Sequence, residues 1–366
     1  MDERSRFRLV ILRNEVDSDH RLWIEACEHM ADRVEYAVVD LTKDDWQERF
    51  TEGRFDGVLT QATGWSAAMK TLYDERIARI RELGEQPMIP SVSEIRIYEN
   101  KRALAQWLRA NAVPHPETRV FEDPVAALDF IRTAELPLVA KTSLGAGGSG
   151  VRILRTRESA ADYIEQTFNG DGAPRDVGPK WQKPGFAKRV LRKLADPAAV
   201  LGRLREYSAM RKDAQKDHVL FQAFIPHSFE WRVVRIGDSF FAHKKLVAAE
   251  KASGSLLKEY GDPPKDLLDF MRGLTDTHGF RSVAVDIFEA PGGGYLVNEI
   301  QCVFGQSDPH QMIVDGVPGR YRWVNDAWLF EPGDFTRFEC FLLRLEYMLE
   351  LLSSAPMRAS SERAVQ

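Results

Sequence analysis

Two carboxylates and an amide near the end of the chain have the spacing of a metal site. A hairpin over residues 282–301, centred on its glycine-rich turn, places Asp286 opposite Glu299. Because side chains alternate along a strand, Gln301 projects from the same face as Glu299. Opposed carboxylates repel each other and so indicate a compensating cation, and oxygen ligands suit Mg²⁺. The alternative is a pair of solvent-exposed acids on an outer face.

A second predicted hairpin, over residues 230–246, carries a mainly cationic face. Its turn sets Glu230 opposite Lys245 and Arg232 opposite His243. Lysine and arginine on rigid strands can hold the phosphates of a nucleotide and stabilise charge that develops during group transfer. The alternative is a ladder of cross-strand salt bridges on the surface.

A glycine-rich segment, SLGAGGSG over residues 143–150, follows Lys141 at the end of a hydrophobic strand. Glycines leave backbone N–H groups accessible, so such a loop can approach phosphate closely. The segment lacks the Gly-Lys-Ser/Thr ending of a P-loop, which excludes that motif. The alternative is a flexible hairpin tip without a ligand.

The first 90 residues predict an open α/β sheet that precedes these motifs. Strands are expected over 8–12, 35–41 and 55–59, and helices over 20–31 and 66–83. The segment contains no Gly-x-Gly-x-x-Gly, which disfavours dinucleotide binding.

The elements that carry the motifs are expected from about Ser91 onward. Residues 170–216 read as a partly helical basic insertion, and the stretch after Gln301 reads as loop-rich. The other expected elements are a helix over 100–112, strands over 136–141, 151–154 and 219–225, and helices over 265–278 and 335–352.

Length and composition restrict the class of protein. The 366 residues are enough for two or three domains, and 44% hydrophobic with 29% charged residues is ordinary for a folded soluble protein. A net charge of −5 lacks the basic excess of a nucleic-acid binder. The three cysteines are far apart, without zinc or disulfide spacing, and no apolar run is long enough to span a membrane. We expect a cytoplasmic protein.

Taken in order, these motifs resemble the ATP-grasp superfamily, and most of all its glutathione-synthetase and peptide-glutamate-ligase branch. The resemblance covers about residues 91–305, and the preceding unit resembles a pre-ATP-grasp domain. It implies an α/β fold with an N-terminal domain over 1–90, a first ATP-grasp subdomain over 91–216, a second over 217–352 and a flexible tail over 353–366. The motifs that carry it are Lys101, Lys141, the GAGGSG loop, Gln222–Ile225, Glu230-Trp231-Arg232, Asp286 and Glu299-Ile300-Gln301.

The resemblance implies that ATP lies between the two subdomains. Arg232 and Lys245 would contact the phosphates or an acyl phosphate, and Asp286, Glu299 and Gln301 would hold Mg²⁺ or Mn²⁺. The family usually has asparagine where Gln301 stands, and an acidic residue is common where Ala223 stands. The implied nucleotide contacts are Lys101, Lys141, Gly145, Gly147, Gly148, Ser149, Gly150, Gln222, Ala223, Phe224, Ile225 and, on the ribose, Glu230.

The implied activity is ATP-dependent ligation of a carboxylate to an amine through an acyl phosphate. The alternatives are a small-molecule kinase on the same fold and a non-catalytic ATP-binding regulatory protein. Gln306 and His310 are candidate substrate contacts because their segment follows the metal strand, and Arg320 is a third candidate because it could pair with a carboxylate. The expected partners are a small carboxylate and an amine, with a peptide or carrier as a further option, and neither nucleic acid nor membrane. A homodimer is left open.

Overall fold

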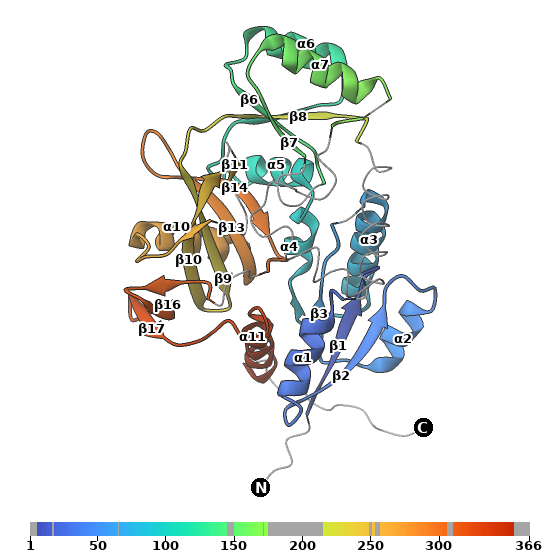
Figure 1. The fold of residues 1–366 in the computed structure, drawn as a ribbon. Helices are drawn as coiled ribbons and strands as arrows, with labels where there is room; N and C mark the ends of the chain where they lie inside the picture. The colour runs from blue at the N-terminus through green and yellow to red at the C-terminus, as the bar shows by residue number, and fades with distance from the viewer. Residues whose placement is uncertain are drawn as a thin grey trace, which may run out of the picture.

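The structure is a computed structural model that contains three β-sheets (Figure 1). It describes residues 6–16, 18–64, 66–144, 150–170, 172–174, 215–248, 251–252, 257–305 and 310–354. Most of the basic insertion therefore lies outside the described residues. So do five candidate site residues: Gly145, Gly147, Gly148, Ser149 and Gln306. Within the described part of the chain, none of the helices combines the length and apolar character needed to cross a bilayer.

The N-terminal sheet is parallel, with strand order β2-β1-β3-β4, which confirms the predicted open α/β sheet. Residues 9–12 of β1 are all 0% exposed, because parallel strands covered on both faces bury every side chain. The unit consists of β1 (Phe7–Arg13), α1 (Arg21–His29), β2 (Val34–Asp40), α2 (Trp46–Gly53), β3 (Gly57–Thr60), α3 (Ala67–Leu83) and β4 (Met88–Ile89).

The second sheet has strand order β5-β8-β6-β7, and two helices pack together against it (Figure 1). Strands β6 and β7 are antiparallel and pair Lys141 with Val151, so the glycine-rich segment joins two paired strand ends. Strand β8 ends at Ala223, earlier than expected. The elements are β5 (Thr118–Phe121), α6 (Pro124–Thr133), β6 (Leu138–Lys141), β7 (Val151–Leu154), α7 (Arg157–Phe168) and β8 (Val219–Ala223).

The largest sheet follows the order β14-β13-β9-β10-β16-β15 and carries three further short or edge strands. Helix α5 (Lys101–Ala110) contacts both β5 and β14, so it bridges the second and the largest sheet. The elements of this sheet and its helix are β9 (Phe229–Ile236), β10 (Ser239–Ala248), β11 (Lys251–Ala252), β12 (Lys258–Glu259), α10 (Lys265–His278), β13 (Ser282–Glu289), β14 (Tyr295–Gln301), β15 (Ile313–Val314), β16 (Val317–Val324) and β17 (Ala327–Pro332).

Two expectations for the last 65 residues need correction. The stretch expected to be loop-rich contains the β16–β17 hairpin, which turns at Asn325 and Asp326 with φ of 50° and 58°. Asparagine and aspartate tolerate the left-handed backbone that such a tight turn requires. The final helix, α11 (Phe341–Ser354), starts six residues later than expected because residues 338–340 all have positive φ.

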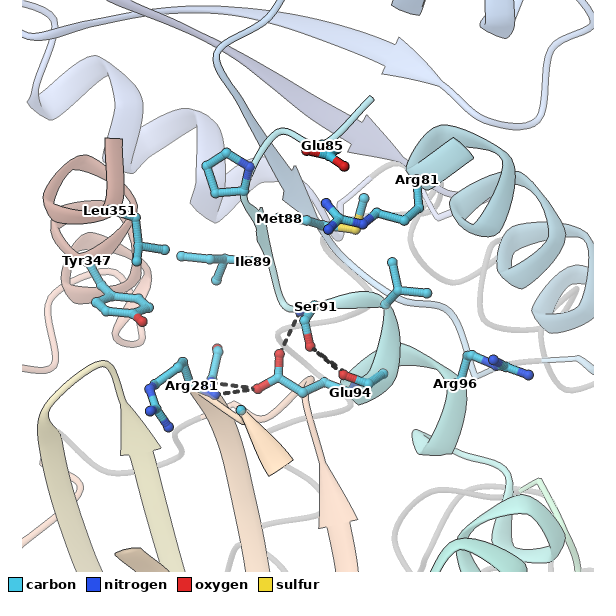
Figure 2. Close-up of a pocket in the computed structure, with 15 residues that line it drawn as sticks. Arg81, Glu85, Met88, Ile89, Ser91, Glu94, Arg96, Arg281, Tyr347 and Leu351 are labelled. Carbon is cyan, nitrogen blue, oxygen red and sulfur yellow. Dashed lines mark hydrogen bonds between the residues drawn. The ribbon is translucent and has the colours of Figure 1, made fainter. Parts of the chain in front are cut away.

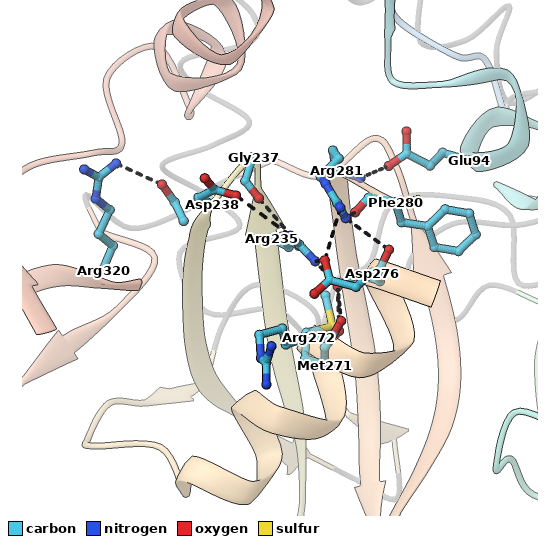
Figure 3. Close-up of polar contacts among 12 residues, drawn as sticks. Glu94, Arg235, Gly237, Asp238, Met271, Arg272, Asp276, Phe280, Arg281 and Arg320 are labelled. Carbon is cyan, nitrogen blue, oxygen red and sulfur yellow. Dashed lines mark hydrogen bonds and ion pairs between the residues drawn. The ribbon is translucent and has the colours of Figure 1, made fainter. Parts of the chain in front are cut away.

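A buried carboxylate ties the start of α4 (Val92–Ile97) to the start of β13 (Figures 2 and 3). Glu94 is 2% exposed, and its Oε2 accepts a hydrogen bond from the Ser91 N–H at 2.6 Å. Its Oε1 accepts from the N–H groups of Arg281 and Ser282 at 2.7 and 2.8 Å. The same junction borders a cavity of about 690 Å³ that Tyr347 of α11 also lines.

We expect Glu94→Ala to lower the free energy of unfolding by about 3 kcal/mol, because it leaves three backbone N–H groups without their acceptor. Chemical denaturation of the full chain measures this change. Glu85→Ala is the matched control, since Glu85 is an exposed residue that lines the same cavity, and it should change stability by less than about 0.5 kcal/mol. Equal effects of the two substitutions would contradict the role of Glu94.

Candidate functional site

The polar residues of the two predicted hairpins meet on one face of the largest sheet. Strand β9 lies between β10 and β13, and the β9–β10 register pairs Glu230 with Lys245 and Arg232 with His243, as predicted. On its other side β9 pairs with β13, which sets Arg232 directly beside Asp286. The two hairpins are therefore one continuous site.

The β13–β14 hairpin pairs Asp286 with Glu299, as predicted, and Gln301 with Ala284. Beyond Asp286 the register shifts, and Ile287 pairs with Val297. The predicted register is therefore wrong from this point to the turn. The cause is a β-bulge that leaves Asn298 as the extra residue, and bulges of this kind are common next to functional sites.

Asp286 is the centre of the site. Its carboxylate is 2% exposed and accepts three hydrogen bonds: from Arg232 Nε at 2.9 Å, from Arg232 Nη2 at 3.0 Å and from Lys245 Nζ at 2.7 Å. Burial alone would raise the pKa of Asp286, but the charges and hydrogen bonds of Arg232 and Lys245 outweigh it and hold the pKa well below its usual range. Asp286 is thus ionised in the folded protein.

The two cations around Asp286 each have a second oxygen partner. Arg232 Nη2 also donates to Gln301 Oε1 at 3.0 Å, and Lys245 Nζ donates to Glu230 Oε2 at 3.0 Å. Burial by itself would lower the pKa of both cations. The neighbouring carboxylates, of which Asp286 has the largest effect, outweigh burial, so both pKa values are raised. Arg232 and Lys245 therefore remain charged, and their N–H groups are arranged to bind anionic oxygen.

Lys141 reaches this face from β6 of the second sheet. Its Nζ donates to Asn298 Oδ1 at 2.8 Å, and Asn298 Nδ2 donates to Glu230 Oε1 at 3.3 Å. Burial lowers the pKa of Lys141 from 10.5 to about 8, and the nearby charge of Lys101 acts in the same direction, against the opposing charges of Glu299, Glu230 and Asp286. Between about pH 8 and 10.5, Lys141 binds fewer protons in the folded chain than in the unfolded chain. The free energy of unfolding therefore rises with pH over this range, as the cost of burying the charged lysine disappears.

Lys101 comes to the site from the first turn of α5. Its Nζ lies 3.4 Å from Glu299 Oε1 and 3.6 Å from Glu99 Oε2. Burial lowers the pKa of Lys101, but the two carboxylates outweigh it and raise the pKa above its ordinary value. Two lysines from different elements thus approach the same edge of β14.

The donor atoms of the predicted metal site fit a hard divalent cation. Asp286 and Glu299 supply carboxylate oxygens, and Gln301 supplies an amide oxygen that shares the donor Arg232 Nη2 with Asp286. Among the described residues no group of three His, Cys, Asp or Glu side chains could hold a metal, and the predicted set contains two carboxylates and one amide. In this structure side chains compensate the opposed carboxylates: Arg232 and Lys245 at Asp286, and Lys101 at Glu299.

The link between the second and the largest sheet runs through residues 222–230. Gln222 is 7% exposed and donates to Thr118 Oγ1 at 3.3 Å, and the Ala223 N–H donates to Glu117 O at 2.8 Å. Phe224 and Ile225 are half-buried and lead through His227 to Glu230 at the polar face. Gln222, Ala223, Phe224 and Ile225 therefore lie in the link between the second and the largest sheet.

The glycine-rich segment is closed by a backbone contact at its base. The Thr142 N–H donates to Gly150 O at 2.9 Å. A Cβ atom at position 150 would lie 1.8 Å from Thr142 Oγ1, so only glycine fits at this close approach. Gly150 is the only one of the implied glycines that lies within the described residues.

The two described candidate substrate residues, His310 and Arg320, lie in different places relative to the polar cluster. His310 precedes Gln311, whose carbonyl contacts His243 Nδ1 at 2.8 Å, so His310 is near the β10 side of the site. Arg320 is paired with Glu331 at 2.8 Å and donates to Ser239 Oγ at 2.9 Å (Figure 3). Ser239 stands six residues before Lys245 on β10, about 20 Å along the strand, so the structure does not bring Arg320 to the cluster.

Two site residues were missed at the sequence level. Asn298 was hidden by the assumption of a regular hairpin, although an amide within the otherwise apolar run YLVN was an available signal. Glu99 has φ of 46°, which is unusual for glutamate, and stands two residues after the end of α4. Neither residue belongs to a short motif with a fixed spacing.

Several solved structures of ligases and synthases have a similar fold. D-alanyl-alanine synthetase A from Vibrio cholerae is 11% identical, with 96% of this chain and 100% of that chain covered and a TM-score of 0.53. D-alanine–D-alanine ligase from Bacillus anthracis is 13% identical, with 95% and 99% covered and a TM-score of 0.51. The chain has the ATP-grasp fold.

A third structure with the ATP-grasp fold is similar over less of its own length. N5-carboxyaminoimidazole synthase from Aspergillus clavatus, solved with ADP and 5-aminoimidazole ribonucleotide, is 12% identical, with 94% of this chain and 77% of that chain covered and a TM-score of 0.53. A 95-residue segment is 25% identical to the trifunctional purine biosynthetic protein adenosine-3 of Bos taurus, and the match spans 26% of this chain and 9% of that protein. No protein-family model matches the chain.

Asp286→Asn should lower the free energy of unfolding by about 3 kcal/mol or more, because Arg232 and Lys245 then lose the carboxylate that compensates them in a buried site. Urea denaturation without nucleotide measures this. Glu299→Gln is the control, since that side chain is 22% exposed and forms a longer ion pair with Lys101, and its effect should stay below about 1 kcal/mol. A small effect of Asp286→Asn would show that Asp286 is not the electrostatic centre.

Asn298→Asp should raise the pKa of Lys141 above about 8, because the neutral acceptor becomes a carboxylate. The pH dependence of acetylation at Lys141, followed by peptide mass spectrometry, reports this, and its midpoint should rise by about 1 or more. The exposed Asn111→Asp should leave the midpoint where it is. An unchanged midpoint in Asn298→Asp would mean that Asn298 does not set the charge of Lys141.

Proposed function

We propose that the chain is an ATP- and Mg²⁺-dependent ligase that joins a carboxylate to an amine through an acyl phosphate. The observation that carries this proposal is the convergence of four cations from three parts of an ATP-grasp fold on one acidic face. Lys101 comes from α5, Lys141 from β6, and Arg232 and Lys245 from the largest sheet. Because such a fold hosts different reactions, these side chains, and not the fold alone, support ligation.

The nucleotide would lie at the junction of the second and the largest sheet. Lys101 and Lys141 would contact its phosphates, and the glycine-rich segment would cover them. Residues 222–225 would border the adenine, and Glu230 would accept hydrogen bonds from the ribose. Lys141 supports this placement because its present acceptor is a neutral amide, which a phosphate oxygen can replace with a gain in charge pairing.

Asp286, Glu299 and Gln301 would hold Mg²⁺ when it is bound with the nucleotide. The ion would supply charge neutralisation for the phosphoryl group under transfer. The chain's own part is to keep the two carboxylates ionised and on one face, and the low pKa of Asp286 secures the first of these conditions. As the ion would take carboxylate oxygens, Arg232 and Lys245 would become available to substrate.

Transfer from ATP to a substrate carboxylate requires electrostatic stabilisation and positioning more than a protein nucleophile. Arg232 and Lys245 are set on adjacent, paired strands and would bind the acyl phosphate oxygens with little reorganisation. The amine would then displace phosphate. Gln306 and His310 are proposed to contact the acid or the amine. The similar solved structures, among them a D-alanine–D-alanine ligase, support formation of a carbon–nitrogen bond and leave the acid and amine open.

The test measures ADP and free phosphate together, with Mg·ATP and divided pools of carboxylic acids, amino acids and short peptides. We expect equal amounts of ADP and phosphate that depend on both an acid and an amine. ADP without free phosphate would contradict ligation and indicate a kinase. ATP binding without turnover in every pool would contradict an enzyme of this class and indicate a regulatory protein.

Lys141→Met should weaken ATP binding by about 10-fold to 100-fold, which is the range for loss of one charged hydrogen bond. Titration calorimetry measures the dissociation constant. Lys43→Met is the control because Lys43 is an exposed residue of the N-terminal unit. Equal affinity of Lys141→Met and the wild type would remove Lys141 from the phosphate site.

A further inference from the structure

A serine, a histidine and an aspartate form a hydrogen-bonded chain beside the proposed phosphate site. Ser143 Oγ lies 2.8 Å from His218 Nε2, and His218 Nδ1 lies 2.8 Å from Asp217 Oδ1. The His218 side chain is 6% exposed, whereas the Asp217 side chain is 74% exposed. None of the three side chains has a role in the proposed ligation, so the cluster calls for its own explanation.

The partners of His218 fix which ring nitrogen carries the proton. An ionised aspartate can only accept a hydrogen bond, so His218 Nδ1 must be the donor. In the neutral ring Nε2 is then unprotonated and accepts the Ser143 hydroxyl proton. The serine oxygen keeps its lone pairs for another reaction partner. A nucleophile bonded to a base, and the base oriented by a carboxylate, is the arrangement that activates serine.

Ser143 is held in place by its backbone at the start of the glycine-rich segment. Its carbonyl accepts the Lys101 N–H at 3.0 Å, and its N–H donates to Gln215 Oε1 at 2.6 Å. It follows Lys141 by two residues, so both lysines proposed to contact phosphates are anchored next to it. The hydroxyl is therefore at the phosphate end of the proposed nucleotide site.

Anchoring of the loop does not require the Ser143 hydroxyl. The Thr142 N–H already closes the base of the loop at Gly150, and Thr142 Oγ1 donates to Leu144 O at 2.6 Å. The two backbone bonds of Ser143 hold the segment on α5 and on Gln215. An oriented His–Asp pair adds the capacity to accept a proton, which a loop anchor does not use.

We propose that Ser143 accepts a phosphoryl group from bound ATP with His218 as general base, an inference that rests on the proposed nucleotide site. Ser143 Oγ forms a bond to the γ-phosphorus, and the bond from that phosphorus to the β–γ bridging oxygen breaks. The electron pair of the broken bond leaves with ADP, and the hydroxyl proton moves to His218 Nε2. Asp217 stabilises the imidazolium, which then releases the proton to solvent.

Modification of Ser143 would act on the ligase itself. A phosphoserine carries nearly two negative charges and three acceptor oxygens. At position 143 it would pair with Lys101 and Lys141 in place of the nucleotide phosphates. Phosphorylated chains are therefore expected to bind ATP more weakly than unmodified chains.

The experiment incubates the full chain with Mg·ATP, without acid or amine, and locates phosphorylation by intact and peptide mass spectrometry. We expect one phosphoryl group on Ser143, none in Ser143→Ala, and a rate about 100-fold lower in His218→Gln. Ser93→Ala is the control, because the described contact of that hydroxyl is with Ser91, and it should be labelled as the wild type is. Calorimetry establishes ATP binding for each variant.

Four outcomes would overturn the proposal. ATP binding to the wild type without any label would remove Ser143 phosphorylation and leave the proposed function standing. Label that persists in Ser143→Ala, or an undiminished rate in an ATP-binding His218→Gln, would remove the serine or its base. Absence of ATP binding in the wild type would overturn both this proposal and the nucleotide site on which it rests.

Discussion

The site depends on one buried interaction, the pairing of Asp286 with Arg232 and Lys245. Three strands, β10, β9 and β13, each contribute one of these residues, so the charges meet only when the sheet has its native register. A single carboxylate between two cations leaves a net positive charge, which Glu230 reduces on one side. This arrangement stays ionised without solvent and forms a permanent polar surface within a protein interior.

Other parts of the molecule bring two further lysines to this surface. Lys141 arrives from the second sheet and meets an amide, whereas Lys101 arrives from α5 and meets Glu299. The two sheets thus contact each other through polar bonds such as the one between Lys141 and Asn298. The stability of this joint therefore depends on the charge state of Lys141.

Turn symmetry and the alternation of side chains were sufficient to predict which residues share a face in both hairpins, and the resemblance gave the fold. The failures have physical causes. A bulge at Asn298 depends on tertiary contacts with Lys141 and Glu230 that no local pattern encodes. Positive φ at residues 338–340 delays α11 without any glycine to signal it. The sequence also could not tell that side chains compensate the opposed carboxylates, because that depends on the β9–β13 pairing.

The bulge in β14 also changes which residues can be compared between the two halves of that strand. Val297, Glu299 and Gln301 follow one another at intervals of two residues, so a regular strand would place them on one face. Val297 nevertheless pairs with Ile287 and is 0% exposed in the core, while Glu299 faces the polar site. Ile300 is three residues from Val297, yet it lies in the same core and is 1% exposed. One additional residue therefore exchanges the two faces of the strand. An alignment that ignores the bulge would therefore equate core residues such as Val297 with residues of the polar site such as Glu299.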